Sequence, residues 1–275
     1  MNKKQKKLEL QIVSDLHAEF WEGKKIKFTK PVAPILLLLG DICCCGSAED
    51  FELFKKCIMT VLPEYEKVIF IPGNHEYYYA PTKPEKVPYE ATMQGIHDKL
   101  KTFAATTNKK FIVLINKTIN LMGYTLIGST LWSLIPEKNQ KFVEKNMNDY
   151  NYIYTWNQET KSAERLKAST ITELFHHNVA YIKRQMKKCQ LNGQKAIILT
   201  HHKPYLSPTY QADNTINPAY ESDLQNLFID PVVLWAYGHT HMADNQKINN
   251  TILYSNPKGY PREKTFFKSN DLVSI

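Results

Sequence analysis

The chain has 275 residues, of which 43% are hydrophobic and 23% are charged. This composition supports a sizeable buried core and argues against intrinsic disorder. The formal net charge is +8, but the lysines are scattered, whereas a nucleic-acid footprint would form a basic patch or stripe. Nucleic acid is therefore possible but not favoured as a partner, and a basic surface would attract small phosphorylated substrates.

Cysteine usage and hydropathy bear on the compartment. Three of the five cysteines are consecutive, Cys43 to Cys45, which suits neither a disulfide framework nor the usual spacing of zinc ligands. Reduced thiols in the cytosol are therefore expected. The run at 8–13 is too short for a signal-peptide core, and the longest apolar runs, 35–39 and 232–237, fall far below the ~20 residues of a membrane span. We predict a cytoplasmic protein with no membrane partner.

The first part of the chain alternates apolar runs with a helical pattern. Residues 8–13, 35–39 and 68–71 are predicted strands, and residues 48–62 are a predicted helix. This rhythm indicates an α/β architecture. Each strand ends in polar residues that can carry chemistry: Ser14-Asp15-Leu16-His17, Gly40-Asp41 and Gly73-Asn74-His75-Glu76. Residues two apart in an extended segment point to the same side, so Asp15 and His17 are expected to converge.

The middle of the chain contains loops, strands and a long helix. The predicted elements are a surface loop at 80–90, a helix at 92–105, strands at 111–114 and 124–128 with a turn near Asn120, and an amphipathic helix at 160–190. An aromatic stretch at 148–156 has two interpretations. Its rings could line a substrate pocket, or they could pack an insertion onto the body of the protein.

The last part of the chain repeats the arrangement of strand followed by polar residues. Strands at 196–199 and 232–237 end in Thr200-His201-His202 and in Gly238-His239-Thr240-His241. Residues 205–223 are predicted to be a loop without a core, and short strands at 252–255 and 272–275 close the chain.

Five strand ends thus carry three Asp or Asn oxygens and four imidazoles, at the edge where open α/β sheets bind ligands. This donor set suits two divalent metal ions such as Mn, Fe or Zn better than Ca or Mg. A bridging carboxylate would hold two ions about 3.5–4 Å apart, an arrangement that activates water and clamps a phosphoryl group. The candidate ligands are Asp15, His17, Asp41, Asn74, His201, His239 and His241.

This ordered set resembles the calcineurin-like metallophosphoesterases, from Asp15 to His241. The resemblance implies an α/β fold, a four-layer α/β/β/α sandwich with two mixed β-sheets. It implies one domain over 1–275, with an aromatic-rich insertion and helix at about 131–192. It also implies a dinuclear metal-dependent phosphoesterase that hydrolyses phosphate mono- or diesters by attack of a metal-bridging hydroxide. The alternatives are a catalytically weak metal-binding module of the same fold, and a nuclease.

The resemblance also implies a role for each residue. Asp15, His17 and His241 hold the first metal, Asn74, His201 and His239 hold the second, and Asp41 bridges them. His75 binds the phosphate and is the expected general acid. Of the adjacent imidazoles, His201 is assigned as the ligand because it comes directly off the strand, and His202 is expected to border the pocket. In similar small bacterial phosphoesterases a loop such as 255–260 lies near the site, and the alternative for this stretch is a plain β-turn.

One position departs from the family pattern. Many members carry an acidic residue three positions after the bridging Asp, and it pairs with the motif histidine. Here that position is Cys44, which argues against the protein Ser/Thr phosphatase branch. A carboxylate partner would raise the pKa of His75 and keep it protonated. The sequence therefore predicts a weaker acid, unless Glu76 or another residue supplies the charge.

Overall fold

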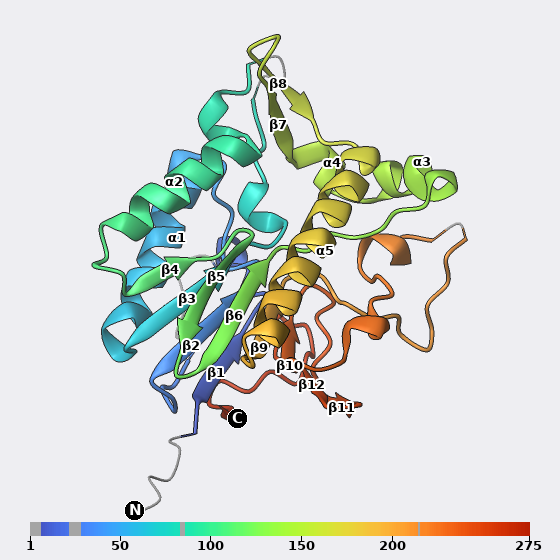
Figure 1. Cartoon of the computed structure of the whole chain (residues 1–275). Coiled ribbons are helices and arrows are strands. Elements are labelled where there is room, and N and C mark those ends of the chain that lie inside the picture. Colours follow the sequence, from blue (N-terminus) through green and yellow to red (C-terminus); the bar gives the residue numbers. More distant parts are fainter. Residues whose placement is uncertain (1–6, 22–28, 83–85, 214) are drawn as a thin grey trace, which may run out of the picture.

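A computed structural model describes residues 7–21, 29–82, 86–213 and 215–275. Its first sheet has five strands in the order β13-β1-β2-β3-β4 (Figure 1). The strands β1 to β4 pair in parallel, and β13 pairs with β1 in the antiparallel sense, so the sheet is mixed. The strands are β1 (Glu9–Val13), β2 (Ile35–Leu39), β3 (Lys67–Ile71), β4 (Phe111–Val113) and β13 (Val273–Ser274).

The second sheet has six strands in the order β11-β12-β10-β9-β6-β5. Its four inner strands pair in parallel, and an antiparallel hairpin closes each edge. The strands are β5 (Lys117–Leu121), β6 (Tyr124–Ser129), β9 (Lys195–Thr200), β10 (Val232–Tyr237), β11 (Asp244–Ile248) and β12 (Thr251–Ser255).

The wholly apolar sequence of β2 is explained by its position between two cores. Ile35, Leu37 and Leu39 pack between the two sheets, against residues of the second sheet such as Leu199. Leu36 and the other residues of opposite parity face the helices instead. A strand that is buried on both faces has no polar side, so its sequence is continuous rather than alternating.

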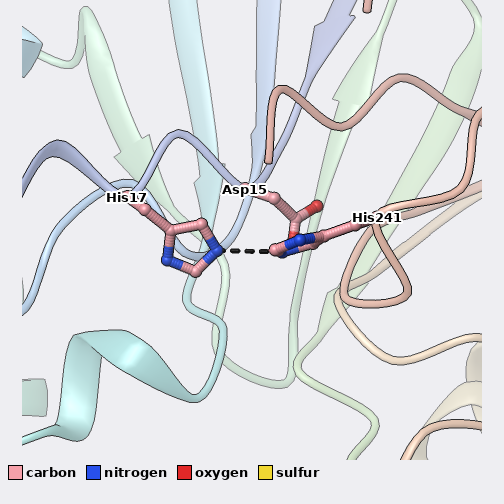
Figure 2. A group of neighbouring side chains, drawn as sticks. All are labelled: Asp15, His17 and His241. Carbon is pink, nitrogen blue, oxygen red and sulfur yellow. Dashed lines mark hydrogen bonds and ion pairs between the residues drawn. The ribbon is translucent and has the colours of Figure 1, made fainter. Parts of the chain in front are cut away.

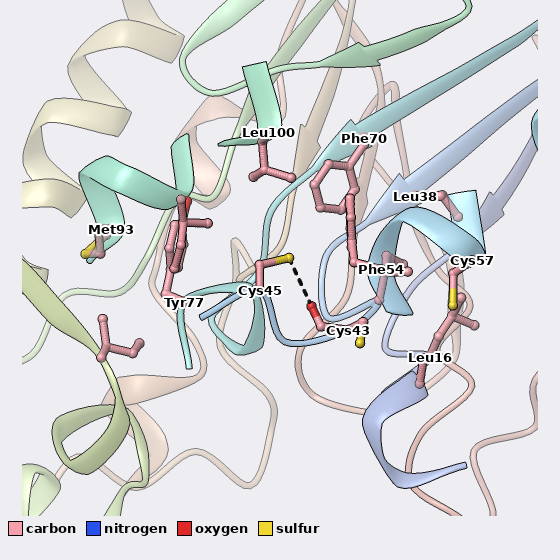
Figure 3. Close-up of a cluster of buried hydrophobic side chains, with 14 of the residues drawn as sticks. Leu16, Leu38, Cys43, Cys45, Phe54, Cys57, Phe70, Tyr77, Met93 and Leu100 are labelled. Carbon is pink, nitrogen blue, oxygen red and sulfur yellow. Dashed lines mark hydrogen bonds between the residues drawn. The ribbon is translucent and has the colours of Figure 1, made fainter. Parts of the chain in front are cut away.

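Helices cover the outer face of each sheet (Figure 1). Helices α1 (Ala48–Val61) and α2 (Met93–Ala105) pack on the first sheet, where Phe54 and Leu100 meet Phe70 of β3 (Figure 3). Helix α5 (Ala168–Leu191) packs on the second sheet. The result is four layers, α/β/β/α, with two mixed sheets, so the predicted fold class is confirmed.

An insertion between β6 and α5 contributes helices α3 (Glu137–Asn146) and α4 (Asp149–Tyr152) and the hairpin β7 (Tyr154–Asn157) and β8 (Ser162–Arg165). Its aromatic side chains serve mainly for packing. Tyr150 is buried in the same hydrophobic core as residues of α1 and α2, and the ring of Trp156 lies edge-on to Tyr89 at 5.4 Å.

Four expectations about local structure were wrong. A strand, β5, occupies the place of the turn near Asn120, because the tight turn lies at Met122-Gly123, where both φ angles are positive. The long helix begins at Ala168, because the residues before it pair in the hairpin of β7 and β8. Strand β11 was not expected, and the 205–223 loop does contribute to the core, through Ala219.

Part of the predicted 80–90 loop, residues 83–85, lies outside the described residues. The five cysteines are unpaired, and Cys43, Cys45 and Cys57 are buried near α1 (Figure 3). Among the described residues, no helix is both long enough and apolar enough to cross a membrane. The remaining short elements of the described residues are 3-10 turns: η1 (Ala18–Phe20), η2 (Leu62–Glu64), η3 (His75–Tyr77), η4 (Tyr89–Ala91), η5 (Asn217–Ala219) and η6 (Gln225–Leu227).

Candidate metal centre

The carboxyl ends of five parallel strands, from both sheets, bring all seven predicted ligands together. Among the described residues, two groups made up only of predicted ligands form there, and within each group the ligand atoms lie within 4.8 Å of one another. The first group is Asp15, His17 and His241, and the second contains Asp41, His201 and His239. Asn74 joins the second group, because its Oδ1 lies 3.1 Å from His201 Nε2.

The backbone at these strand ends is unusual. Five of the seven residues have a positive φ, between 48° and 68°, although none of them is glycine. Asp15 and His17 therefore converge through left-handed turns, and the expectation that strand alternation would align them was wrong. Left-handed backbone costs a non-glycine residue about 1–3 kcal/mol and tends to occur at functional sites. The five are Asp15, His17, Asp41, His239 and His241.

In the first group, two imidazoles face each other directly. His17 Nε2 lies 2.9 Å from His241 Nε2, and His241 Nε2 lies 3.5 Å from Asp15 Oδ1 (Figure 2). His241 Nδ1 bonds Glu263 Oε2 at 2.7 Å, which turns the Nε2 atom towards the group. A carboxylate behind a histidine is the usual way to fix the orientation of a metal-ligating ring.

In the second group, the geometry favours His201 as the ligand. His201 Nδ1 donates to the carbonyl of Leu39 at 2.7 Å, which leaves Nε2 to face Asp41 and Asn74. His239 Nε2 is buried and has no hydrogen-bond partner among the described residues. A buried unpaired nitrogen is costly in a folded protein, so this atom fits a metal ligand.

His202 lies behind the site. Its ring packs on His239 at 4.1 Å and on Trp132 at 5.2 Å, and its Nδ1 lies 3.3 Å from the carbonyl of Thr130. Burial, together with the charge of His201, lowers the pKa of His202 to about 3. The expectation that His202 borders the pocket was wrong, because it is not among the lining residues.

Asp41 lies between the two groups. Its Oδ2 is 3.8 Å from His17 Nε2, and its Oδ1 is 3.4 Å from His201 Nε2. Burial acts to raise the pKa of Asp41, but the imidazoles of His201, His75 and His17 outweigh it and hold the pKa well below its usual range. The carboxylate is therefore ionised and presents one oxygen to each group.

Asn74 is oriented by a residue that the sequence did not reveal. Its Nδ2 donates to Asp149 Oδ1 at 2.9 Å, which leaves its Oδ1 free to face the site. The hydroxyl of Tyr78 donates to the same carboxylate oxygen at 2.5 Å. Asp149 is in the insertion, at the start of α4, so the insertion helps to position a candidate ligand.

Glu19, in the turn η1, supplies the carboxylate partner of His75 that is absent at position 44. Its Oε1 accepts from His75 Nδ1 at 2.9 Å and lies 3.4 Å from His17 Nδ1. Burial acts to lower the pKa of His75, but the charges of Asp41 and Glu19 outweigh it and raise the pKa. His75 therefore has the acidic partner that the sequence seemed to lack. The only signal for Glu19 in the sequence is its position two residues after His17.

Glu76 has a different task. Its carboxylate accepts hydrogen bonds from the backbone N–H groups of Asp41, Ile42 and Gly73 at 2.6–2.9 Å. These bonds tie the loop after β2 to the loop after β3. Glu76 thus fixes the backbone on either side of the site, and the hydrogen bond to His75 comes from Glu19 instead.

A pocket of about 320 Å³ opens over the two groups. Its floor includes Asp41, Asn74, His75, His239 and His241. This volume is at the lower end of the range for small-molecule sites. The walls come from the insertion and from two loops, and they include Asn146, Met147, Asn148, Ile216, Tyr220, Tyr260 and Glu263.

Comparison with known proteins agrees with this geometry. The sequence profile described as calcineurin-like phosphoesterase matches residues 11–243. The chain belongs to this family. Membership supports a metal-binding hydrolase, and the candidate ligands from Asp15 to His241 all lie within the matched region.

Individual relatives cover nearly the whole chain. An uncharacterized protein of Acanthamoeba polyphaga mimivirus, L509, is 31% identical over 290 residues, which is 97% of this chain and 96% of that protein. The fold is similar to that of a phosphopantetheinyl hydrolase from Mycobacterium tuberculosis, with a TM-score of 0.67, 18% identity, and coverage of 94% of this chain and 92% of that one. A putative 5'-nucleotidase from Staphylococcus aureus has a TM-score of 0.49 and 12% identity, covering 93% of this chain and 49% of that one.

Proposed function

We propose that the protein is a dinuclear metal-dependent phosphoesterase that hydrolyses phosphate mono- or diesters of small molecules. The observation that carries the proposal is the position of Asp41, whose two carboxylate oxygens face two separate groups of ligand atoms. A single-metal or purely structural site would not need a carboxylate shared between two groups. The proposal takes residues 1–275 as one domain, with the insertion as part of it.

The residues of the site fit two divalent ions. Asp15, His17 and His241 would hold one ion, Asn74, His201 and His239 would hold the other, and Asp41 would bridge them. Imidazoles with carboxylate and amide oxygens suit Mn, Fe or Zn. When bound, such a pair of ions supplies hydroxide from water at neutral pH and polarises the phosphoryl group.

The protein's own contribution to the chemistry is a proton held at a fixed place. Glu19 binds His75 Nδ1, and the other nitrogen, Nε2, belongs to a residue of the pocket floor. With Nδ1 held by Glu19, Nε2 is the nitrogen of His75 that would donate to a bound phosphoryl group, and its proton would pass to the leaving oxygen. General acid catalysis of this kind contributes roughly 10²–10⁴ in rate.

An activity screen tests the proposal. The protein is reconstituted with Mn, Fe or Zn, its metal content is measured, and it is assayed on aryl monoesters, aryl diesters, nucleotides and DNA. Two bound ions and turnover of at least one small ester are expected. Two bound ions without turnover would instead favour a metal-binding module of the same fold, and activity confined to DNA would favour a nuclease.

A further inference from the structure

The loop that follows β12 is hydrogen-bonded to the residues that follow β1. The N–H groups of Lys258 and Gly259 donate to the carbonyls of Ser14 and Asp15 at 2.9 and 2.8 Å, and Ser14 N–H donates to the carbonyl of Asn256. Gly259 has a φ of 75°, a left-handed turn that glycine adopts without strain. These contacts support the interpretation that this stretch borders the site, and they fix the position of the next residue, Tyr260.

The ring of Tyr260 covers the first ligand group. Its centroid lies 4.3 Å from the ring of His17 and 4.8 Å from the ring of His241. Its backbone N–H donates to Glu263 Oε2 at 2.8 Å, and the same oxygen bonds His241 Nδ1. One carboxylate therefore positions both Tyr260 and a candidate metal ligand.

The hydroxyl of Tyr260 reaches the nitrogen of His75 that Glu19 leaves free. It lies 3.3 Å from His75 Nε2, and Tyr260 is part of the pocket wall. No other hydrogen bond of this hydroxyl occurs among the residues that the structure describes. Packing on His17 and His241 would require only a phenyl ring, so the hydroxyl has no structural task in that contact.

We infer that Tyr260 is a catalytic residue whose hydroxyl, together with His75 Nε2, donates a hydrogen bond to a phosphoryl oxygen of the bound substrate. The inference rests on the proposed function. Two donors that lie 3.3 Å apart can share one acceptor oxygen or bind two oxygens of the same phosphoryl group. The phenol is a neutral donor, so it binds the phosphate without exchanging a proton with it.

The test compares Tyr260→Phe with wild type, both loaded with metal. The variant keeps the ring and loses only the hydroxyl, so metal content and melting temperature should not change. Its affinity for inorganic phosphate, measured by calorimetry, and its kcat/KM should each fall about tenfold, a typical effect of losing a hydrogen bond to a charged group. Tyr89→Phe is the matched control, because it removes an exposed hydroxyl that bonds Asp98.

Several results would overturn the inference. The inference is wrong if the phosphate affinity and the kcat/KM of Tyr260→Phe both stay within twofold of the wild-type values. It is also wrong if the wild-type protein binds no phosphate. If Tyr260→Ala loses metal while Tyr260→Phe is unchanged, the ring only packs on the ligands. If wild type with two ions hydrolyses no ester, the proposed function fails, and the phosphate-binding comparison still decides the role of Tyr260.

Discussion

Glu19 and His75 are joined by a hydrogen bond of 2.9 Å between Oε1 and Nδ1, although they follow different strands of the first sheet. Burial acts to raise the pKa of Glu19, but its bonds to His17 and His75 outweigh it and bring the pKa to about 2. Glu19 is therefore ionised at neutral pH, and the positive charge on His75 is stabilised. Cys44, at the position where many relatives carry the acidic residue, lies beside this pair.

Removing the charge of Glu19 should weaken His75 as an acid. Glu19→Gln is expected to lower kcat about tenfold or more on alkyl phosphates, whose leaving group needs a proton, and less on aryl phosphates. His75→Ala should show the same dependence on leaving group. The measurement is kcat for a series of esters with graded leaving-group pKa.

The chain offers a rescue for this experiment. In Glu19→Ala/Cys44→Asp, the carboxylate returns to the position that many family members use, and part of the lost activity on alkyl phosphates should return. Cys44→Asp alone, with Glu19 present, controls for the added charge. Equal losses on alkyl and aryl esters in Glu19→Gln would contradict this role for Glu19.

The two adjacent histidines should differ in metal binding. His201→Ala removes a nitrogen that faces Asp41 and Asn74, so the protein should bind close to one ion instead of two. His202→Ala should keep two ions, because the ring packs behind the site. Metal content by mass spectrometry decides between them, and a His201→Ala protein with two ions would show that the assignment is wrong.

Gly73 should not tolerate a side chain. A Cβ atom there would clash with Asp41 Oδ1 and lie 2.7 Å from the His201 ring. Gly73→Ala should therefore displace the Asp41 carboxylate and reduce the amount of bound metal. Overpacking should also lower the free energy of unfolding by about 1–3 kcal/mol. Gly123→Ala is the control, because a Cβ there meets nothing within 4 Å and adds only backbone strain. Equal metal content in both variants would contradict the prediction.

His97 should make the protein less stable in acid. It is half-buried in α2, where its Nε2 bonds the hydroxyl of Tyr77 at 2.8 Å, and desolvation lowers its pKa to about 4 against a small opposing effect of Asp98. The unfolded pKa is about 6.5, so the folded state favours the neutral ring. The contribution of neutral His97 to the free energy of unfolding is therefore complete above pH 6.5. It is lost progressively as the pH falls from 6.5 towards 4, because the unfolded chain takes up a proton that the folded protein does not.

Urea denaturation at pH 7.5 and pH 5 measures this effect. Wild type should lose about 2 kcal/mol more unfolding free energy between the two pH values than His97→Gln does. His176→Gln, which replaces an exposed histidine of α5, should behave like wild type. The same loss in His97→Gln as in wild type would show that His97 is not responsible.

The sequence predicts the sheets well because β2, β9 and β10 are apolar runs that end abruptly in polar residues. The order of the four layers was implied by the family resemblance, and it agrees with a strand such as Ile35–Leu39, which has no polar face to expose. The candidate ligands could be named for the same reason, because each lies within four residues of the end of a strand. Glu19 and Asp149 could not, because their partners are 56 and 75 residues away and meet them only after the sheets pack.

The segment Gly238–His241 supplies one imidazole to each ligand group, His239 to the second and His241 to the first. It is also the last of the five segments to be synthesised, more than 220 residues after Asp15. A chain cut short before Gly238 would lack one candidate ligand of each group. If the proposed ions bind, metal loading would thus distinguish chains that reach His241 from shorter ones, even where strands β1 to β4 had already folded during translation.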